Sequence, residues 1–244
     1  MSRLIAHLLD QLDALKRERQ ELLTAASPVQ RLFGAASTTR VIDGGLATQL
    51  ETGYGCDLNH KLWSSLVLQS QPELITRAHA DFIREGARMI VSCSYQSSLE
   101  GFEGNRSAFE QSIRQAVKCA RRAVGEESRE GDQKVLVAGS CGSYGASLCS
   151  GEEYSGAYPG CPSLEEWPKC LHTCEGTVRP PSSKVPDADD SNQICKDEWR
   201  QFFASWHRAR AELLIGTGGV DLLGVETVPR ALEGAAASEL LEAL

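Results

Sequence analysis

Polar and aromatic residues follow four short apolar runs of this 244-residue sequence, and these residues are the ones best suited to chemistry. The four run ends are Asp43-Gly44-Gly45, Cys93-Ser94-Tyr95-Gln96, Gly139-Ser140-Cys141-Gly142 and Glu226-Thr227. The carboxyl ends of parallel strands meet at one edge of a sheet, where α/β proteins collect their binding and catalytic groups. Asp43 and Glu226 could exchange protons with a substrate there, as acid–base carboxylates do. We therefore expect a polar site built from these run ends.

The apolar runs alternate with amphipathic segments of helical periodicity, which predicts a helix after each strand. The expected strands span 41–43, 89–95, 135–140 and 221–227. The first expected helix begins at Pro72 and ends at Gly86. The second begins at a capping box of Ser107 and Glu110 and continues to Val124. The third spans 197–215, and the fourth begins at Pro229. Strict alternation with short joints predicts an α/β fold with a parallel sheet, either a barrel or an open sheet.

Two regions lie outside this alternation. Residues 4–23 carry leucines at helical spacing and a linker follows, so residues 1–36 are interpreted as an amphipathic helical extension and the main domain as 37–244. The Pro-, Ser- and Asp-rich stretch 159–197 is interpreted as a loop insertion after the third strand. Its Cys170, His172 and Cys174 could bind a metal in principle, but their spacing fits no standard zinc knuckle.

The acidic composition argues against some classes of binding partner. A formal net charge of −8 without a basic patch argues against binding to nucleic acid or to an anionic membrane. No apolar run approaches the roughly 18 residues that cross a bilayer, and charges interrupt the N-terminal segment, which argues against a signal peptide. We therefore expect a cytoplasmic protein. The nine cysteines include no C-x-x-C pair, so the sequence shows neither a disulfide framework nor a ready zinc site.

An ordered set of short motifs resembles the homocysteine S-methyltransferase family. The motifs are residues 43–51 (DGGLATQLE), 62–64 (LWS), 79–81 (HAD), 94–98 (SYQSS), 137–140 (VAGS), 144–145 (YG), 151–154 (GEEY) and 222–229 (LLGVETVP). Each motif alone is weak, but together they run in order from about residue 40 to residue 244, interrupted only by the insertion. No G-x-G-x-x-G turn joins a strand to a helix, which disfavours a Rossmann-type methyltransferase.

The resemblance implies a (β/α)8 TIM-barrel enzyme of methionine biosynthesis that transfers a methyl group to the thiol of homocysteine. By match of position, Asp43, Glu226 and Thr227 would bind the amino acid substrate, Glu226 through the substrate ammonium. Trp63 and Tyr95 would line the pocket of a cationic methyl donor, since aromatic faces attract sulfonium and quaternary ammonium groups. The donor is S-methylmethionine, S-adenosylmethionine or betaine, and the sequence does not distinguish them.

The resemblance also implies a zinc ion held by three cysteines late in the barrel, with homocysteine as its fourth ligand. This chain carries about four of eight βα units, so we expect the zinc cysteines beyond Leu244 and no zinc on this chain. Cys93 and Cys141 are poor substitutes, and Cys56 and Cys119 are interpreted as loop and helix thiols. Two alternatives stay open: a non-catalytic half-barrel that binds a ligand or associates with itself, and another barrel enzyme using Asp43 and Glu226 as acid–base groups.

Overall fold

The computed structural model describes residues 41–128, 134–159, 180–181, 184–186 and 192–244. The chain divides into two units, Met1–Arg40 and Val41–Leu244, and the described residues all belong to the second. The helix and linker expected over 1–36 therefore lie outside the described residues. So does most of the insertion expected over 159–197. The boundary expected after residue 36 stays a prediction.

The sheet is parallel, with its strands in chain order. Strands β1 (Met89–Val91), β2 (Leu136–Gly142) and β3 (Leu222–Glu226) lie side by side as β1-β2-β3. The run expected as a first strand over 41–43 makes a single parallel bridge, Ile42 to Met89, on the outer side of β1. Right-handed crossovers between strands in this order bring the connecting helices to one face of the sheet. The described fold is α/β with a parallel sheet, as the sequence predicts.

The second strand is shorter than expected. It ends at Val91 rather than at residue 95. The backbone turns out of the sheet immediately afterwards, because the Ser94 amide bonds back to the Ser92 carbonyl at 2.7 Å. The apolar and β-branched run predicted the strand's existence, but this turn of small polar residues decides where it ends.

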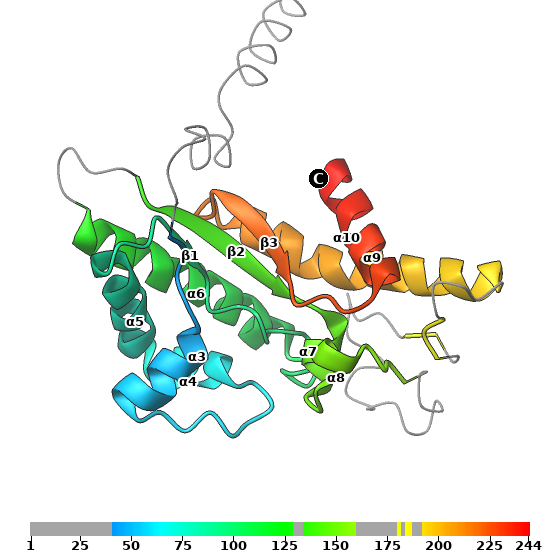
Figure 1. Cartoon of the computed structure of the whole chain (residues 1–244), viewed down its shortest axis with the longest axis horizontal. Coiled ribbons are helices and arrows are strands. Elements are labelled where there is room, and N and C mark those ends of the chain that lie inside the picture. Colours follow the sequence, from blue (N-terminus) through cyan, green and yellow to red (C-terminus); the bar gives the residue numbers. More distant parts are fainter. Residues whose placement is uncertain (1–40, 129–133, 160–179, 182–183, 187–191) are drawn as a thin grey trace, which may run out of the picture. The chain divides into compact units, whose positions relative to one another are not determined.

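The long helices α5 (Pro72–Arg84), α6 (Arg106–Glu127) and α9 (Gln193–Gly216) pack on the strands, and α10 (Ala231–Ala243) packs on α9. Figure 1 shows α6 and α9 running behind β2 and β3, and each helix packs against the next along the chain. The capping box expected at Ser107 and Glu110 is wrong. Asn105 caps α6 by accepting from the Ala108 amide at 3.1 Å. Helix α9 begins at Gln193, so residues 193–197 belong to this helix and not to the insertion.

Short helices follow the strand ends, and periodicity does not predict them because they have only three to seven residues. They are α3 (Leu46–Thr48), the π-helix η1 (Gln49–Gly53), α4 (Ser64–Ser70), α7 (Tyr144–Leu148) and α8 (Glu152–Ser155). Together with the strand ends they build the side of the sheet at which the polar residues collect.

Four apolar clusters of buried residues pack the described helices and strands together, and two of them show the pattern. One joins α5, α6 and the strands through buried residues such as Ile83, Ile90 and Val137. The other is aromatic and packs Tyr144 of α7 against Trp199 and Phe203 of α9. Strand β2 is buried throughout, whereas every residue of β3 is only half-buried. Among the described helices, none has the length and apolar composition to cross a bilayer.

Candidate functional site

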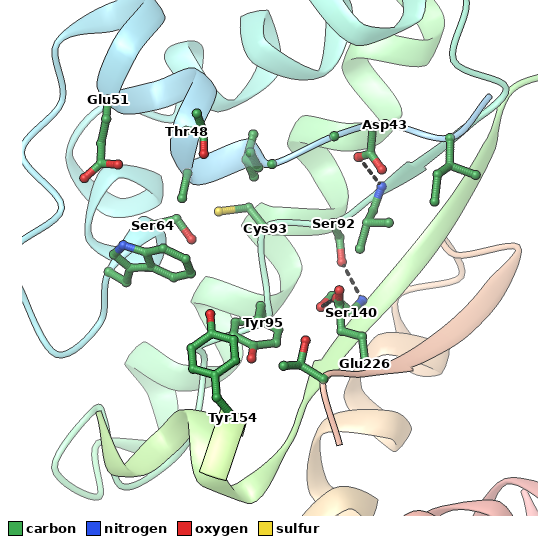
Figure 2. A pocket seen from close by; sticks show the side chains of 18 residues that line it. Asp43, Thr48, Glu51, Ser64, Ser92, Cys93, Tyr95, Ser140, Tyr154 and Glu226 are labelled. Carbon is green, nitrogen blue, oxygen red and sulfur yellow. Dashed lines mark hydrogen bonds between the residues drawn. The ribbon is translucent and has the colours of Figure 1, made fainter. Parts of the chain in front are cut away.

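A cavity of about 360 Å³ opens at the carboxyl ends of the strands (Figure 2). Segments from across the chain line it: the Ile42 bridge and the turn after it, α3, η1, the start of α4, the ends of β1 and β3, Ser140 of β2, and α8. All five site residues expected from the sequence are in its wall: Asp43, Trp63, Tyr95, Glu226 and Thr227. The fold brings together side chains that are up to 184 positions apart in the chain (227 − 43).

Asp43 is held by the backbone of the neighbouring strand. Its amide donates to the Met89 carbonyl at 3.0 Å, and its carboxylate accepts from the Val91 amide at 2.7 Å. Burial raises the pKa of Asp43 to about 6, the bond from Val91 opposes this shift, and the nearby Glu226 carboxylate adds to it. The two carboxylates are thus close enough to repel each other, and a cation placed between them would be favoured.

Glu226 ends β3 and points toward the cavity in Figure 2. One of its oxygens accepts a hydrogen bond from the Ser140 hydroxyl. Ser140 is itself fixed, since its amide donates to the Ser92 hydroxyl at 3.0 Å. In the part of the chain that the structure describes, no donor is bonded to the other Glu226 oxygen, so this oxygen is available to a ligand.

Trp63 and Tyr95 form the aromatic part of the wall. Their ring centroids are 6.4 Å apart with the planes at 63°, an edge-on contact that leaves ring faces for a ligand. Burial raises the pKa of Tyr95 to about 12, a hydrogen bond with the Thr227 side chain opposes this, and Glu153, Tyr154 and Glu226 raise the pKa further. The Tyr95 hydroxyl is therefore neutral at physiological pH.

Two wall residues have a positive φ, a backbone conformation that residues other than glycine rarely adopt. Trp63 has φ 46° and Thr227 has φ 55°. A β-branched residue such as threonine is strained in this region, at roughly 1–3 kcal/mol. Strain of this kind collects where the surrounding structure imposes a position on a side chain, which agrees with a binding role for this wall.

The thiols near the cavity do not fit a zinc site. Cys93 lines the cavity, but burial raises the pKa of its thiol to about 12, and burial also raises that of Cys141. A metal ligand must be a thiolate. Within the described ranges no three His, Cys, Asp or Glu side chains come together to hold a metal ion. Cys56 follows η1 in a loop and Cys119 lies in α6, as expected.

Among the other polar residues of the wall, Glu51, Ser92 and Tyr154 were not predicted as site residues, whereas Ser140 belongs to one of the expected run ends. Glu51 and Tyr154 end two of the motifs noted in the sequence, and Ser140 ends a third. The position of each residue within its motif was therefore the available signal. The sequence did not predict η1 and α8, the short helices that place Glu51 and Tyr154 at the cavity.

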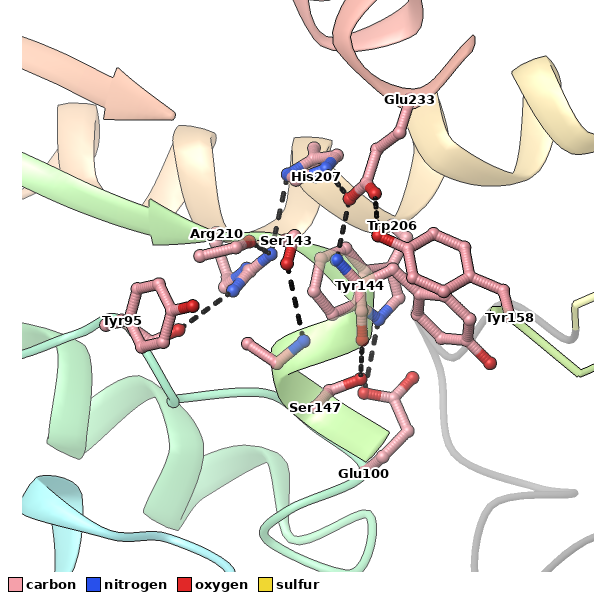
Figure 3. A network of polar contacts seen from close by, with 12 residues as sticks. Tyr95, Glu100, Ser143, Tyr144, Ser147, Tyr158, Trp206, His207, Arg210 and Glu233 are labelled. Carbon is pink, nitrogen blue, oxygen red and sulfur yellow. Dashed lines mark hydrogen bonds and ion pairs between the residues drawn. The ribbon is translucent and has the colours of Figure 1, made fainter. Parts of the chain in front are cut away.

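A buried network of charged and polar groups lies behind this wall (Figure 3). Its centre is Glu233 of α10, which is fully buried. Glu233 accepts from the Tyr144 amide at 2.6 Å and the Tyr158 hydroxyl at 2.5 Å, and pairs with His207 Nε2 at 2.9 Å. Burial lowers the pKa of His207, and its Nδ1 faces Arg210 at 3.4 Å. A neutral imidazole protonated on Nε2 donates to Glu233 and accepts from Arg210 through Nδ1.

Arg210 connects this network to the strand ends. Its guanidinium donates to the Gly142 carbonyl at 2.8 Å and lies 3.5 Å from the Tyr95 carbonyl oxygen. It also stacks on Trp206, with 3.8 Å from Cζ to the ring centroid. Gly142 has no room for a side chain, because a Cβ there would lie 2.5 Å from the Tyr95 carbonyl oxygen. The network thus fixes the backbone that presents Tyr95 to the cavity.

Comparisons with known proteins agree on one family. The family model described as homocysteine S-methyltransferase matches residues 40–244. Homocysteine S-methyltransferase 2 of Zea mays is 35% identical over 229 residues, covering 90% of this chain and 56% of the relative. Selenocysteine Se-methyltransferase of Brassica oleracea var. italica is 35% identical over 215 residues, covering 83% and 51%. The chain thus spans about half the length of the curated relatives it matches.

Solved structures give the same result. The oxidized form of the homocysteine methyltransferase MmuM from Escherichia coli superposes with a TM-score of 0.65 at 31% identity, covering 88% of this chain and 61% of that one. The metallated form of the same enzyme gives a TM-score of 0.63 at 32% identity, covering 87% and 62%.

Proposed function

This chain belongs to the homocysteine S-methyltransferase family, and we propose that its cavity binds homocysteine beside a cationic methyl donor, whose methyl group passes to the homocysteine thiol to give methionine. One observation carries the proposal. Two carboxylates, Asp43 and Glu226, and two aromatic rings, Trp63 and Tyr95, line a single cavity at the strand ends.

Asp43 and Glu226 are proposed to hold the substrate ammonium. Their carboxylates are close enough to interact electrostatically, and the bonds from Val91 and Ser140 fix their orientation. A charge-assisted hydrogen bond to an ammonium group is stronger than a neutral one. The Thr227 side chain, bonded to Tyr95, is proposed to complete this end of the site.

Trp63 and Tyr95 are proposed to face the donor cation, a sulfonium or a quaternary ammonium. S-methylmethionine, S-adenosylmethionine and betaine all carry such a group, and the attraction comes from the ring quadrupoles. In the transfer, the thiolate sulfur of homocysteine forms a bond to the methyl carbon while the bond from that carbon to the donor's sulfur or nitrogen breaks. The donor leaves with the electron pair as a neutral thioether or tertiary amine.

Formation of the thiolate needs help at neutral pH, since a free thiol has a pKa of about 8.5. A bound zinc ion would supply it, as the resemblance implies. The described residues do not fit a zinc site, so the part proposed for them is to bind and orient the two substrates.

The sheet is proposed to be part of a (β/α)8 barrel, with the described elements forming about four of its βα units. The parallel strands in chain order and the likeness to the Escherichia coli enzyme support this. The outer edge of β3 has no strand partner among the residues described. A polypeptide of these 244 residues is therefore proposed to self-associate through its strand edges, and a purely monomeric species in sedimentation would contradict this. The cytoplasmic location stays a prediction.

Affinity for homocysteine is expected to fall as the pH drops below about 6, because protonation of Asp43 removes a charge from the ammonium site. The pKa of Asp43 is raised, so the carboxylate that the ligand needs is present above about pH 6 and is lost below it. Each further pH unit should then weaken binding by up to about tenfold. Titrations between pH 5 and 8 would measure this. Asp43→Asn should remove most of the dependence, and an unchanged pH profile in that variant would contradict the role of Asp43.

A methyl-transfer assay tests the function itself. The protein is incubated with homocysteine, added zinc and each donor in turn, and methionine is measured by mass spectrometry. Methionine formed with at least one donor is the expected result, with the added zinc, rather than a zinc ion held by the described residues, activating the homocysteine thiol. The second candidate is a binding protein without catalysis, which the absence of a metal-ligand group among the described side chains favours. Homocysteine binding without methionine from any donor would support that candidate and overturn the first.

A further inference from the structure

Tyr154 is an aromatic residue that the proposed binding roles leave unused. Its side chain lines the cavity, yet the residue is 77% exposed. Figure 2 shows its ring at the same side of the cavity as Tyr95. A large exposed ring at a cavity rim is a surface that a bound molecule would cover.

The backbone, not the side chain, fixes the position of Tyr154. Helix α8 is only four residues long and lies between Gly151 and Gly156, which have φ of 92° and 65°. The Gly156 carbonyl accepts from Arg230 Nε at 2.5 Å. On the other side, a Cβ on Gly145 would lie 2.6 Å from the Glu153 amide nitrogen, so α7 packs directly on the α8 backbone. The ring is therefore presented to the cavity by a supported turn of chain.

Carboxylates line the cavity, and two of them, Glu153 and Glu226, act electrostatically on Tyr95. The residues that the structure describes in the cavity wall include the carboxylates of Asp43, Glu51 and Glu226 and no Lys, Arg or His side chain. Glu153 lies close enough to Tyr95 to act on its hydroxyl electrostatically. The Oε2 atom of Glu153 is buried and has no hydrogen-bond partner among the residues that the structure describes. A buried carboxylate oxygen without a donor is unfavourable until a positive charge or donor comes near.

We propose that Tyr154 determines which ligands the cavity accepts, with its ring covering an onium cation on the side of Tyr95 and with Glu153 supplying the nearby negative charge. This inference rests on the proposed function, because it assigns a further contact to the donor end of the same cavity. It makes the ring face of Tyr154, rather than its hydroxyl, the recognising group. It also separates the two ends of the site, since Tyr154 contributes to binding of the cation and not to binding of the homocysteine ammonium.

Choline and its neutral carbon isostere, 3,3-dimethylbutan-1-ol, test this inference by NMR titration. The wild-type protein should bind choline and prefer it to the isostere. Tyr154→Ala should weaken choline binding by roughly 3- to 30-fold, the range of a lost cation–π contact, whereas Tyr154→Phe should bind like the wild type. Glu153→Gln should weaken choline binding several-fold and leave the isostere unaffected. The neighbouring Glu152, which accepts from the Ser150 amide, gives a matched control, and Glu152→Gln should change neither.

Homocysteine affinity is measured in the same variants. It distinguishes a failure of the role of Tyr154 from a failure of the proposed homocysteine site. Tyr154→Ala should leave this affinity unchanged, and because the side chain is exposed the variant should fold normally. Choline binding that is equal in Tyr154→Ala and wild type would overturn this inference while leaving the proposed function standing. A wild-type protein that binds neither choline nor homocysteine would overturn both.

Discussion

Glu226→Gln is expected to weaken homocysteine binding by roughly 30- to 1000-fold, which corresponds to about 2–4 kcal/mol. The substitution keeps the size of the side chain and an oxygen that can accept from Ser140, so the wall should keep its shape. It removes the charge that faces the substrate ammonium. Isothermal titration with homocysteine would measure the loss. The variant should keep a weak affinity for homocysteine, because Asp43 still contributes its charge.

A surface carboxylate provides the control for this variant. Glu212 of α9 is exposed and, among the described residues, pairs with Arg208 of its own helix. Glu212→Gln should leave the homocysteine affinity within about twofold of the wild-type value, because exposed pairs of this kind contribute little. A Glu226→Gln protein that binds homocysteine as tightly as this control would contradict the role assigned to Glu226.

Glu233→Ala is expected to lower the free energy of unfolding by about 3–5 kcal/mol. Glu233 is fully buried and accepts three bonds, from Tyr144, Tyr158 and His207. Alanine at this position would leave three buried donors without an acceptor, and each would have lost its bond to water on folding. Urea denaturation followed by circular dichroism would measure the change.

Glu239 of the same helix makes a matched comparison. It is exposed and lies 3.6 Å from Arg200 of α9. Glu239→Ala should cost less than about 1 kcal/mol, as is typical of a surface ion pair. Equal unfolding free energies for Glu233→Ala and Glu239→Ala would show that the buried network does not stabilise α10 against α9.

The long elements could be predicted because their signals are strong and local. The apolar face of α5, its Pro72 start and its end before Gly86 all appear in the sequence as they do in the structure. The boundaries that failed depend on single hydrogen bonds. Asn105 rather than Ser107 caps α6, and the turn at Ser94 ends β1 early. Such choices between neighbouring polar residues are decided by backbone geometry that composition and periodicity do not contain.

The site was predictable where its residues come directly after a strand. Asp43 and Glu226 follow apolar runs, and parallel strands bring such ends together. Tyr154 and Glu51 were not predicted as wall residues, since they reach the cavity through α8 and η1, which are too short to leave a periodic pattern. The network of Glu233, His207 and Arg210 was also missed. His207 and Arg210 are neighbours on α9, and only the packing of α9 on α10 brings Glu233 to them.

The central claim is that Asp43 and Glu226 hold the ammonium group of homocysteine in this cavity, and a pair of ligands tests it most directly. Homocysteine and 4-mercaptobutanoate differ only in the amino group, so titration of both into the same protein isolates the contribution of that group. We expect homocysteine to bind at least about 30-fold more tightly, in line with the loss expected for Glu226→Gln. This preference should disappear when Asp43→Asn is combined with Glu226→Gln. Equal affinity of the wild-type protein for the two ligands would contradict the claim.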